Sequence, residues 1–265
     1  VRTEQKTNKL STILDALDAY PVEKARSLLL EIVRSSKRAK QDRLAAYERY
    51  ERSIAADNAS ELLDLANNIE DGLVLATVLE TIGNRPDVSG DSLLLDKMTS
   101  RAPEVRAAAL CALGKRKVSQ AIPHVLSSLQ DDDAQVLCAA AAVAGTLNAN
   151  DAVPLLLKIA ASNDHMLRRA SLMSLCELKV PGAVSLAIDS LQQPETQLAA
   201  LHYVGQFGTP SQLEAVTKVA LTNRSIEVLG TVAKVLSGWV ENRSSSLADR
   251  QRIQAALAHI HGHSG

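Results

Sequence analysis

The chain has 265 residues, of which 46% are hydrophobic, and its 29 Lys and Arg nearly balance its 30 Asp and Glu. The hydrophobic fraction argues against disorder, and the near-neutral charge argues against a general binder of nucleic acids or membrane surfaces. One Trp, one Phe and four Tyr leave aliphatic side chains and alanine to fill the interior, which disfavours an aromatic stacking platform.

Three cysteines, Cys111, Cys138 and Cys176, match neither a disulfide framework nor a zinc-ligand pattern in their spacing. We expect them to be small, largely buried and unreactive. No uncharged apolar run is long enough for a membrane span, and no secretory segment opens the chain. Because the chain begins with valine and not methionine, we expect it to be a processed product or a segment of a larger protein.

Residues 1–70 show helical spacing of apolar residues without a clear repeat. The spacing predicts helices over 10–17 and 25–33, separated by Pro21, then over 41–55 and 60–69, the last capped by Asn58. We expect these atypical helices to cover the first apolar face of the region that follows.

Residues 71–240 contain an internal repeat. The segment 105–114 recurs at 136–145 and 167–176 in steps of 31, again 29 residues later, and upstream at 74–83, with a weaker copy from Ile226. A second motif, 121–123, recurs at 152–154 and more loosely at 183–185. Two amphipathic motifs per period predict a helical hairpin whose apolar faces are buried by stacking on neighbouring hairpins. The fold class predicted is therefore all-α, an α-α superhelix or solenoid with a period of about 31 residues.

Residues between these motifs indicate where helices begin and end. Pro123 and Pro154 fall in the first turn of second helices, where a missing N–H is harmless. Candidate N-caps for the following helices are the residues of three short segments: Asp131-Asp132-Asp133, Asn163-Asp164 and Asn223. Glycines near the ends of first helices are expected to take left-handed C-terminal positions: Gly83, Gly114, Gly145 and Gly205.

The run Pro103-Glu104-Val105-Arg106 through Ala112-Leu113-Gly114 resembles the HEAT-repeat family, particularly the short bacterial variety of phycobilisome-linker lyases. The resemblance implies that the arginine, retained as Arg106 and Arg168, pairs with an aspartate column that includes Asp133 and Asp164. It also implies that the second helix of each hairpin lines the inner curve. Because the arginine column is incomplete, we expect little from it beyond local capping.

A polar turn at 241–246 precedes a helix predicted over 247–260, which would close the stack. We expect one solenoid domain over 1–265, with N-terminal capping helices at 1–70, HEAT-like repeats at 71–240, and a C-terminal capping helix and tail at 241–265.

A search for chemical motifs finds no nucleophile elbow, phosphate-binding loop or zinc-protease motif. The basic run 34–43 and the alternating histidines at 259, 261 and 263 are better explained as solvated surface and a chain terminus than as nucleic-acid or metal sites. The triplet 131–133 lacks the Gly and distal Glu of a calcium loop. The sequence predicts no catalytic, cofactor-binding or metal-binding residues, which favours a protein that binds without catalysing.

The remaining candidate is a column of polar positions on successive second helices. At offsets of 31, 31 and 29 the column reads Ser127, Lys158, Asp189 and Lys218. These residues form either ordinary solvated surface or a mixed-charge stripe that grips a partner. The function predicted is a non-enzymatic protein-interaction scaffold for another protein or another domain of the parent chain. Alternatives are a chromophore-lyase-like protein or accessory subunit, and a nucleic-acid-binding module using residues 34–43.

Overall fold

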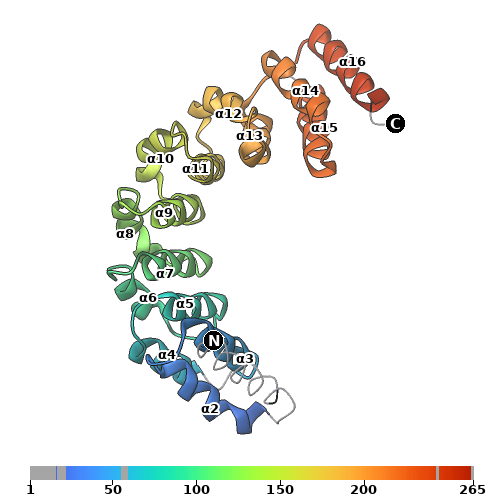
Figure 1. The fold of residues 1–265 in the computed structure, drawn as a ribbon. Helices are drawn as coiled ribbons and strands as arrows, with labels where there is room; N and C mark the ends of the chain where they lie inside the picture. The colour runs from blue at the N-terminus through green and yellow to red at the C-terminus, as the bar shows by residue number, and fades with distance from the viewer. Residues whose placement is uncertain (1–15, 17–21, 55–58, 243–244, 264–265) are drawn as a thin grey trace. The chain divides into compact units, whose positions relative to one another are not determined.

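In the computed structural model, the described residues are 16, 22–54, 59–242 and 245–263, and the regular elements among them are all helices (Figure 1). The predicted helix at 10–17, apart from Ala16, and the cap Asn58 lie outside them. The chain divides into two compact units, residues 1–124 and 125–265, with the boundary inside one short helix. Each unit is described by itself.

The helices confirm the predicted two-per-repeat pattern. In the first unit and across the boundary they are α2 Val22–Arg34, α3 Lys40–Glu51, α4 Ala59–Asn68, α5 Leu73–Asn84, α6 Asp91–Lys97, α7 Pro103–Lys115 and α8 Ile122–Ser128. In the second unit they are α9 Ala134–Thr146, α10 Val153–Ala160, α11 His165–Glu177, α12 Val184–Ser190, α13 Pro194–Phe207, α14 Leu213–Thr222, α15 Ile226–Glu241 and α16 Leu247–His263. Single 3-10 turns precede α8, α10, α12 and α14, and Pro123 and Pro154 lie in first turns as predicted.

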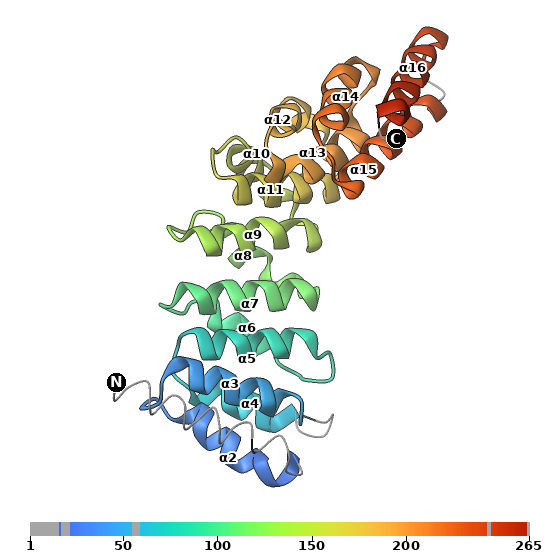
Figure 2. The same ribbon diagram turned by 45° about the vertical axis from the view of Figure 1, so that its right-hand side comes forward.

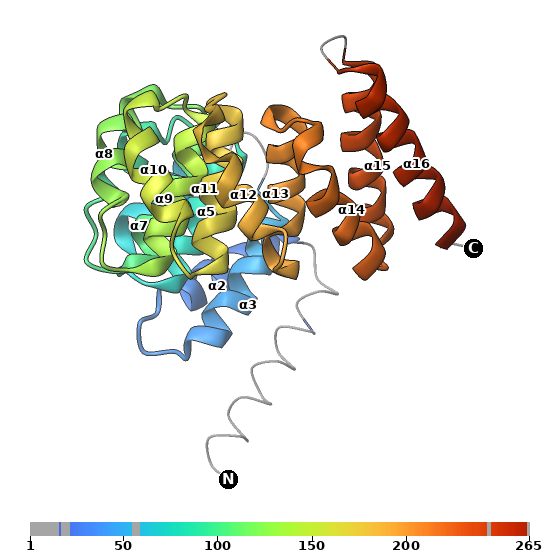
Figure 3. The same ribbon diagram turned by 90° about the horizontal axis from the view of Figure 1, so that it is seen from above.

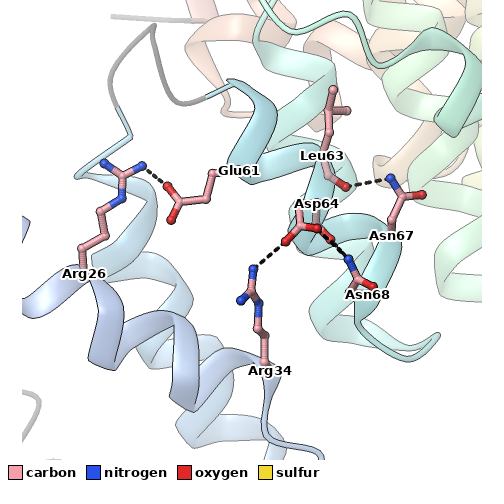
Figure 4. Close-up of polar contacts among 7 residues, drawn as sticks. All are labelled: Arg26, Arg34, Glu61, Leu63, Asp64, Asn67 and Asn68. Atoms are coloured by element: carbon pink, nitrogen blue, oxygen red, sulfur yellow. Dashed lines mark hydrogen bonds and ion pairs between the residues drawn. The ribbon is translucent and has the colours of Figure 1, made fainter.

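The first unit is a stack in which α5 packs between α3 and α7 (Figure 2). Its core side chains, including Leu79, Ile82 and Leu110, are fully buried. At the N-terminal end two ion pairs join α2 to α4, Arg26 with Glu61 and Arg34 with Asp64 (Figure 4).

The second unit arranges its helices in two rows. Figure 1 shows α9, α11, α13 and α15 along the inner side of this unit's curve and α10, α12 and α14 along the outer side. Helices of the inner row pack against one another in order, α9 with α11, α11 with α13, and α13 with α15. At the end, α16 runs alongside α15 (Figure 3).

The glycines near the ends of first helices do not adopt the left-handed conformation that the sequence pattern predicts. They lie inside α5, α7, α9 and α13. A Cβ added to Gly83 would approach the Cα of Ala112 on α7 to 2.7 Å, and one added to Gly145 would approach the Cα of Ser174 on α11 to 2.8 Å. These two glycines therefore serve close packing between neighbouring helices, because any side chain would hold the backbones apart.

The left-handed positions belong to other residues, spaced 31 apart: Lys117, Asn148 and Lys179, with φ of 55°, 54° and 57°. Each ends its helix with the same pair of backbone hydrogen bonds. At Lys117, its own N–H donates to the Gly114 carbonyl and the Val118 N–H to the Leu113 carbonyl, both at 3.0 Å. This is a Schellman motif, repeated with the period of the fold.

Side chains at the N-terminal ends of the inner-row helices only partly match the prediction. Asp133 and Asp164 are N-caps, accepting from two backbone N–H groups each. Asn223 is not: its Oδ1 accepts from the Ser225 N–H at 2.7 Å, and Ser225 is the N-cap residue of α15.

The arginine column hydrogen-bonds to backbone carbonyls. Arg168 donates to the Ser162 carbonyl and Arg106 to the Ser100 carbonyl, in both cases six residues earlier. Gln197, which replaces the arginine in the next repeat, donates from Nε2 to the Leu191 carbonyl at 3.0 Å, again six residues earlier. The column therefore satisfies carbonyl groups at the end of the preceding hairpin.

Another set of arginine contacts in the first unit has no counterpart in the sequence prediction. Arg116 donates to the carbonyls of Arg85 at 2.8 Å and Val88 at 2.9 Å, and to the Asp91 carboxylate at 2.5 Å. Arg85, 31 residues earlier, donates in turn to the Ile54 carbonyl at 3.3 Å. Each arginine follows the end of a first helix and ties its repeat to the preceding one.

Candidate functional site

The structure brings together two of the four predicted partner-binding residues. Asp189 on α12 and Lys218 on α14 line one groove of about 610 Å³ between these helices, which we name the outer groove. Lys158 on α10 and Ser127 on α8 are exposed but lie outside it. Because α10, α12 and α14 form the outer row, the column lies on the side opposite to the one the family resemblance implied (Figure 1).

The inner row carries a second groove, also of about 610 Å³, between α11 and α13 with a contribution from α15. We name it the inner groove; it is lined by Arg169, Met173, Cys176, Glu177, Leu198, Ala199, His202 and Glu227. This groove was not predicted from the sequence, because second helices were expected on the inner side. The signal available was the spacing of Met166 and Met173, two turns apart on a helix whose other apolar positions are needed for packing.

The position of α11 follows from its sequence. Asp164 caps its N-terminus, while Ala170, Leu172 and Leu175 are buried and fix which face points inward to the core. That leaves Met166 and Met173 on the exposed face, and each is 51% exposed. Two half-exposed methionines on one helix are an apolar surface that water solvates poorly, and the flexible thioether adapts to varied partners.

Hydrogen bonds hold the walls of the inner groove in place. The Ser174 hydroxyl donates to the Ala141 carbonyl and accepts from the Gly145 N–H at 3.1 Å, joining α11 to α9. On the other side, the Cys176 thiol donates to Gln206 Oε1 at 2.7 Å and joins α11 to α13. The groove is therefore built on helices that are fixed to their neighbours, which is the kind of support that a preorganised binding surface needs.

Charges in the inner groove are of both signs. Arg169, Met173 and Glu177 follow one another at intervals of four along α11, so that the apolar side chain lies between a cation and a carboxylate. Partial burial raises the pKa of Glu177. Glu227 adds a second carboxylate from α15.

The cysteines offer little nucleophilic chemistry. Burial raises the pKa of both Cys138 and Cys176, which favours the thiol over the reactive thiolate. None of the three cysteines forms a disulfide in the described part of the chain, and all three are half-buried. In the part of the chain that the structure describes, no group of three or more His, Cys, Asp or Glu is placed to hold a metal ion.

Part of the basic run at residues 34–43 contributes to packing within the first unit. Arg43 is buried, donates to the Val33 carbonyl at 2.7 Å and pairs with Glu70, while Arg34 pairs with Asp64. The run therefore uses two of its cations to hold the first unit together. Positions 259, 261 and 263 belong to α16, and their side chains lie outside the part of the chain that the structure describes.

Comparisons with known proteins agree with this architecture. HEAT repeats match over residues 59–144, 91–176 and 153–237, which together span more than half of the chain. A chain of the CpcE–CpcF complex of phycocyanin lyase from Nostoc sp. PCC7120 is similar in structure, with a TM-score of 0.54 and 17% identity, over 89% of this chain and 94% of that one. An engineered protein is similar with a TM-score of 0.55 and 17% identity, over 95% of this chain and 88% of that one.

No protein with a curated description matches this sequence. Among the described residues, no helix combines the length and the apolarity needed to cross a membrane. The repeated helical hairpins, their period and the matched segments lead to one assignment: the chain is a helical-repeat solenoid that belongs to the HEAT-repeat family.

Proposed function

We propose that this chain is a protein-docking scaffold that binds a segment of another protein, or of another domain of its parent chain, without catalysing a reaction. The inner groove is the observation that carries the proposal. Its lining combines the apolar side chains of Met173, Leu198 and Ala199 with charged groups from α11 and α15. Protein interfaces typically combine apolar and polar groups in this way.

The outer groove is the competing surface. It holds Asp189 and Lys218, and its apolar side chains, Val184, Ile188 and Ala215, are smaller or better covered than the half-exposed Met173. Apolar surface contributes to binding affinity when it is removed from water, so a more exposed apolar side chain can contribute more than one that is already covered. We therefore assign docking to the inner groove, and the charged column is the alternative surface that the experiment below tests.

Capture of a partner protein on the immobilised chain distinguishes docking in the inner groove from docking on the charged column. Met173→Glu places a charge in the lining of the inner groove, whereas Lys158→Glu combined with Lys218→Glu reverses two charges of the column, and neither residue lines that groove. We expect the first variant to lose a partner that the wild type captures and the double variant to retain it. Loss in the double variant alone would assign docking to the column, and retention in both would contradict either surface.

The structural similarity to a phycocyanin lyase complex makes a lyase-like or accessory role a second candidate. A tetrapyrrole site needs a partly apolar pocket with some polar groups, and the lining of the inner groove has both kinds of residue. Neither groove is lined by Phe, Tyr or Trp. Incubation with a free linear tetrapyrrole tests this role. A red-shifted absorbance band that Met173→Glu abolishes would support it, and an unchanged spectrum would leave docking of protein alone.

A further inference from the structure

We infer that the inner groove accepts an amphipathic helix on which an apolar side chain lies four residues from an acidic residue on one side and four residues from a basic residue on the other. The inference rests on the proposed docking function and specifies the chemistry of the partner. It is carried by the order of charges along α11, which is Arg169, Met173 and Glu177.

The spacing of these three residues sets the geometry of the partner. Residues four apart lie on nearly the same face of a helix, about 6 Å apart along its axis. A partner helix that lies along α11 can place one residue opposite each of these three when its own contacting residues are also four apart. Its apolar side chain then rests on Met173 while its acidic residue faces Arg169 and its basic residue faces Glu177.

The two charged groups on α11 are available for such pairing. Among the described residues, the ion pairs do not include Arg169 or Glu177, and neither side chain has a hydrogen bond to a protein group. Partial burial already removes water from the Glu177 carboxylate, and a cation supplied by a partner offsets that loss. The charge order thus selects against a helix that is basic or acidic at both ends.

Residues of α13 and α15 on the other side of the inner groove modify this preference for one acidic and one basic residue, but they do not abolish it. Glu227 contributes a second carboxylate and His202 lies on α13, so that the groove presents two acidic groups and one guanidinium. A basic residue on the partner therefore gains more than an acidic one. The acidic residue is still required, because otherwise Arg169 loses water without gaining a partner.

Three fluorescein-labelled, alanine-based helical peptides test the inference. They share a central leucine and differ only at the positions four residues before and after it, which are Glu and Lys, Lys and Lys, or Glu and Glu. Fluorescence anisotropy measures their affinities for the 265-residue chain and for Arg169→Glu, Glu177→Lys and the matched control Lys158→Glu on the outer row.

The wild type and Lys158→Glu should bind the Glu/Lys peptide about threefold more tightly than either other peptide, as expected for partly exposed ion pairs. Arg169→Glu should prefer the Lys/Lys peptide and Glu177→Lys the Glu/Glu peptide. One order of affinity shared by all four proteins, or no binding of any peptide, would overturn the inference. If Met173→Glu still abolished partner capture in that case, the docking function would stand and only the charge rule would fail.

Discussion

Alanine in place of glycine should have opposite effects at two positions in the second unit. Gly145 lies against α11, where a new Cβ would come within 2.8 Å of both the Cα and the Oγ of Ser174. Gly230 lies in α15 and is exposed, and a Cβ there would meet nothing within 4 Å. We expect Gly145→Ala to destabilise the second unit and Gly230→Ala to stabilise it.

The magnitudes follow from the geometry. Carbon atoms pack best at about 3.5–4.0 Å, so α9 and α11 must separate by about 1 Å around the new methyl group at Gly145. Overpacking against backbone costs about 3 kcal/mol, and the better helix propensity of alanine returns about 1 kcal/mol, for a net loss of about 2 kcal/mol. At Gly230 only the propensity gain of about 1 kcal/mol remains. The difference between the variants is therefore about 3 kcal/mol.

Urea denaturation followed by fluorescence measures both effects. Trp239, the one tryptophan of the sequence, is 3% exposed in α15 and therefore reports unfolding of the second unit. The transition should move to lower urea for Gly145→Ala and to higher urea for Gly230→Ala, with equal slopes. A neutral or stabilising effect of Gly145→Ala would refute the conclusion that these glycines serve close packing.

Three further outcomes are expected. Lys117→Gly and Lys179→Gly should each raise the thermal midpoint by relieving a left-handed conformation, a gain of about 1 kcal/mol, and a fall in the midpoint would contradict the helix-end assignment. Arg116→Met should lower the free energy of unfolding by about 2–4 kcal/mol in urea denaturation followed by circular dichroism, because two partly buried carbonyls and the Asp91 carboxylate lose their donor. A loss below about 1 kcal/mol would show that water replaces the guanidinium. Hydrogen bonding to Arg43 holds the pKa of Glu70 below its ordinary value, so its contribution to stability is present above about pH 4.3 and is lost as the pH falls through the lowered folded pKa. The thermal midpoint of Glu70→Gln should therefore change less between pH 6 and pH 3 than that of the wild type, and equal changes would exclude this pair as a source of acid sensitivity.

The repeat was predictable because its signal is spread over many residues. Each hairpin repeats the same apolar spacing, and a single helical hairpin cannot bury such faces alone. Even an imperfect copy, such as the one from Ile226, therefore folds into the expected helix, α15. The proline positions were predictable for a similar reason, and so were N-caps within two of the three proposed segments, since their effect depends only on local backbone geometry.

The roles of single residues were harder to predict where they depend on a neighbouring repeat. Gly145 looks like a helix terminator in sequence, and only the approach of Ser174 from α11 shows that it is a packing position. Arg116 looks like a surface cation, although its donors reach carbonyls about 30 residues earlier in the chain. Such contacts depend on the distance between helices, which the apolar pattern does not encode.

Of the two grooves, the sequence predicted residues of the outer one and none of the inner one. The column of Lys158, Asp189 and Lys218 has the expected exposure and spacing, and two of its members share a groove. The column was expected on the inner side of the curve, and it lies on the outer row of helices in the second unit. Spacing within a repeat does not show which of the two helices lies on the inner side. Met173 was passed over for the same reason.

Methionine methyl NMR tests the central claim that partners dock in the inner groove most directly. The sequence has three methionines: Met98 is 5% exposed in the first unit, whereas Met166 and Met173 are each 51% exposed on α11. With 13C-labelled methyl groups, addition of the Glu/Lys peptide should shift the Met173 signal strongly and leave that of Met98 unchanged. Saturable binding that leaves the Met173 signal in place would contradict the account.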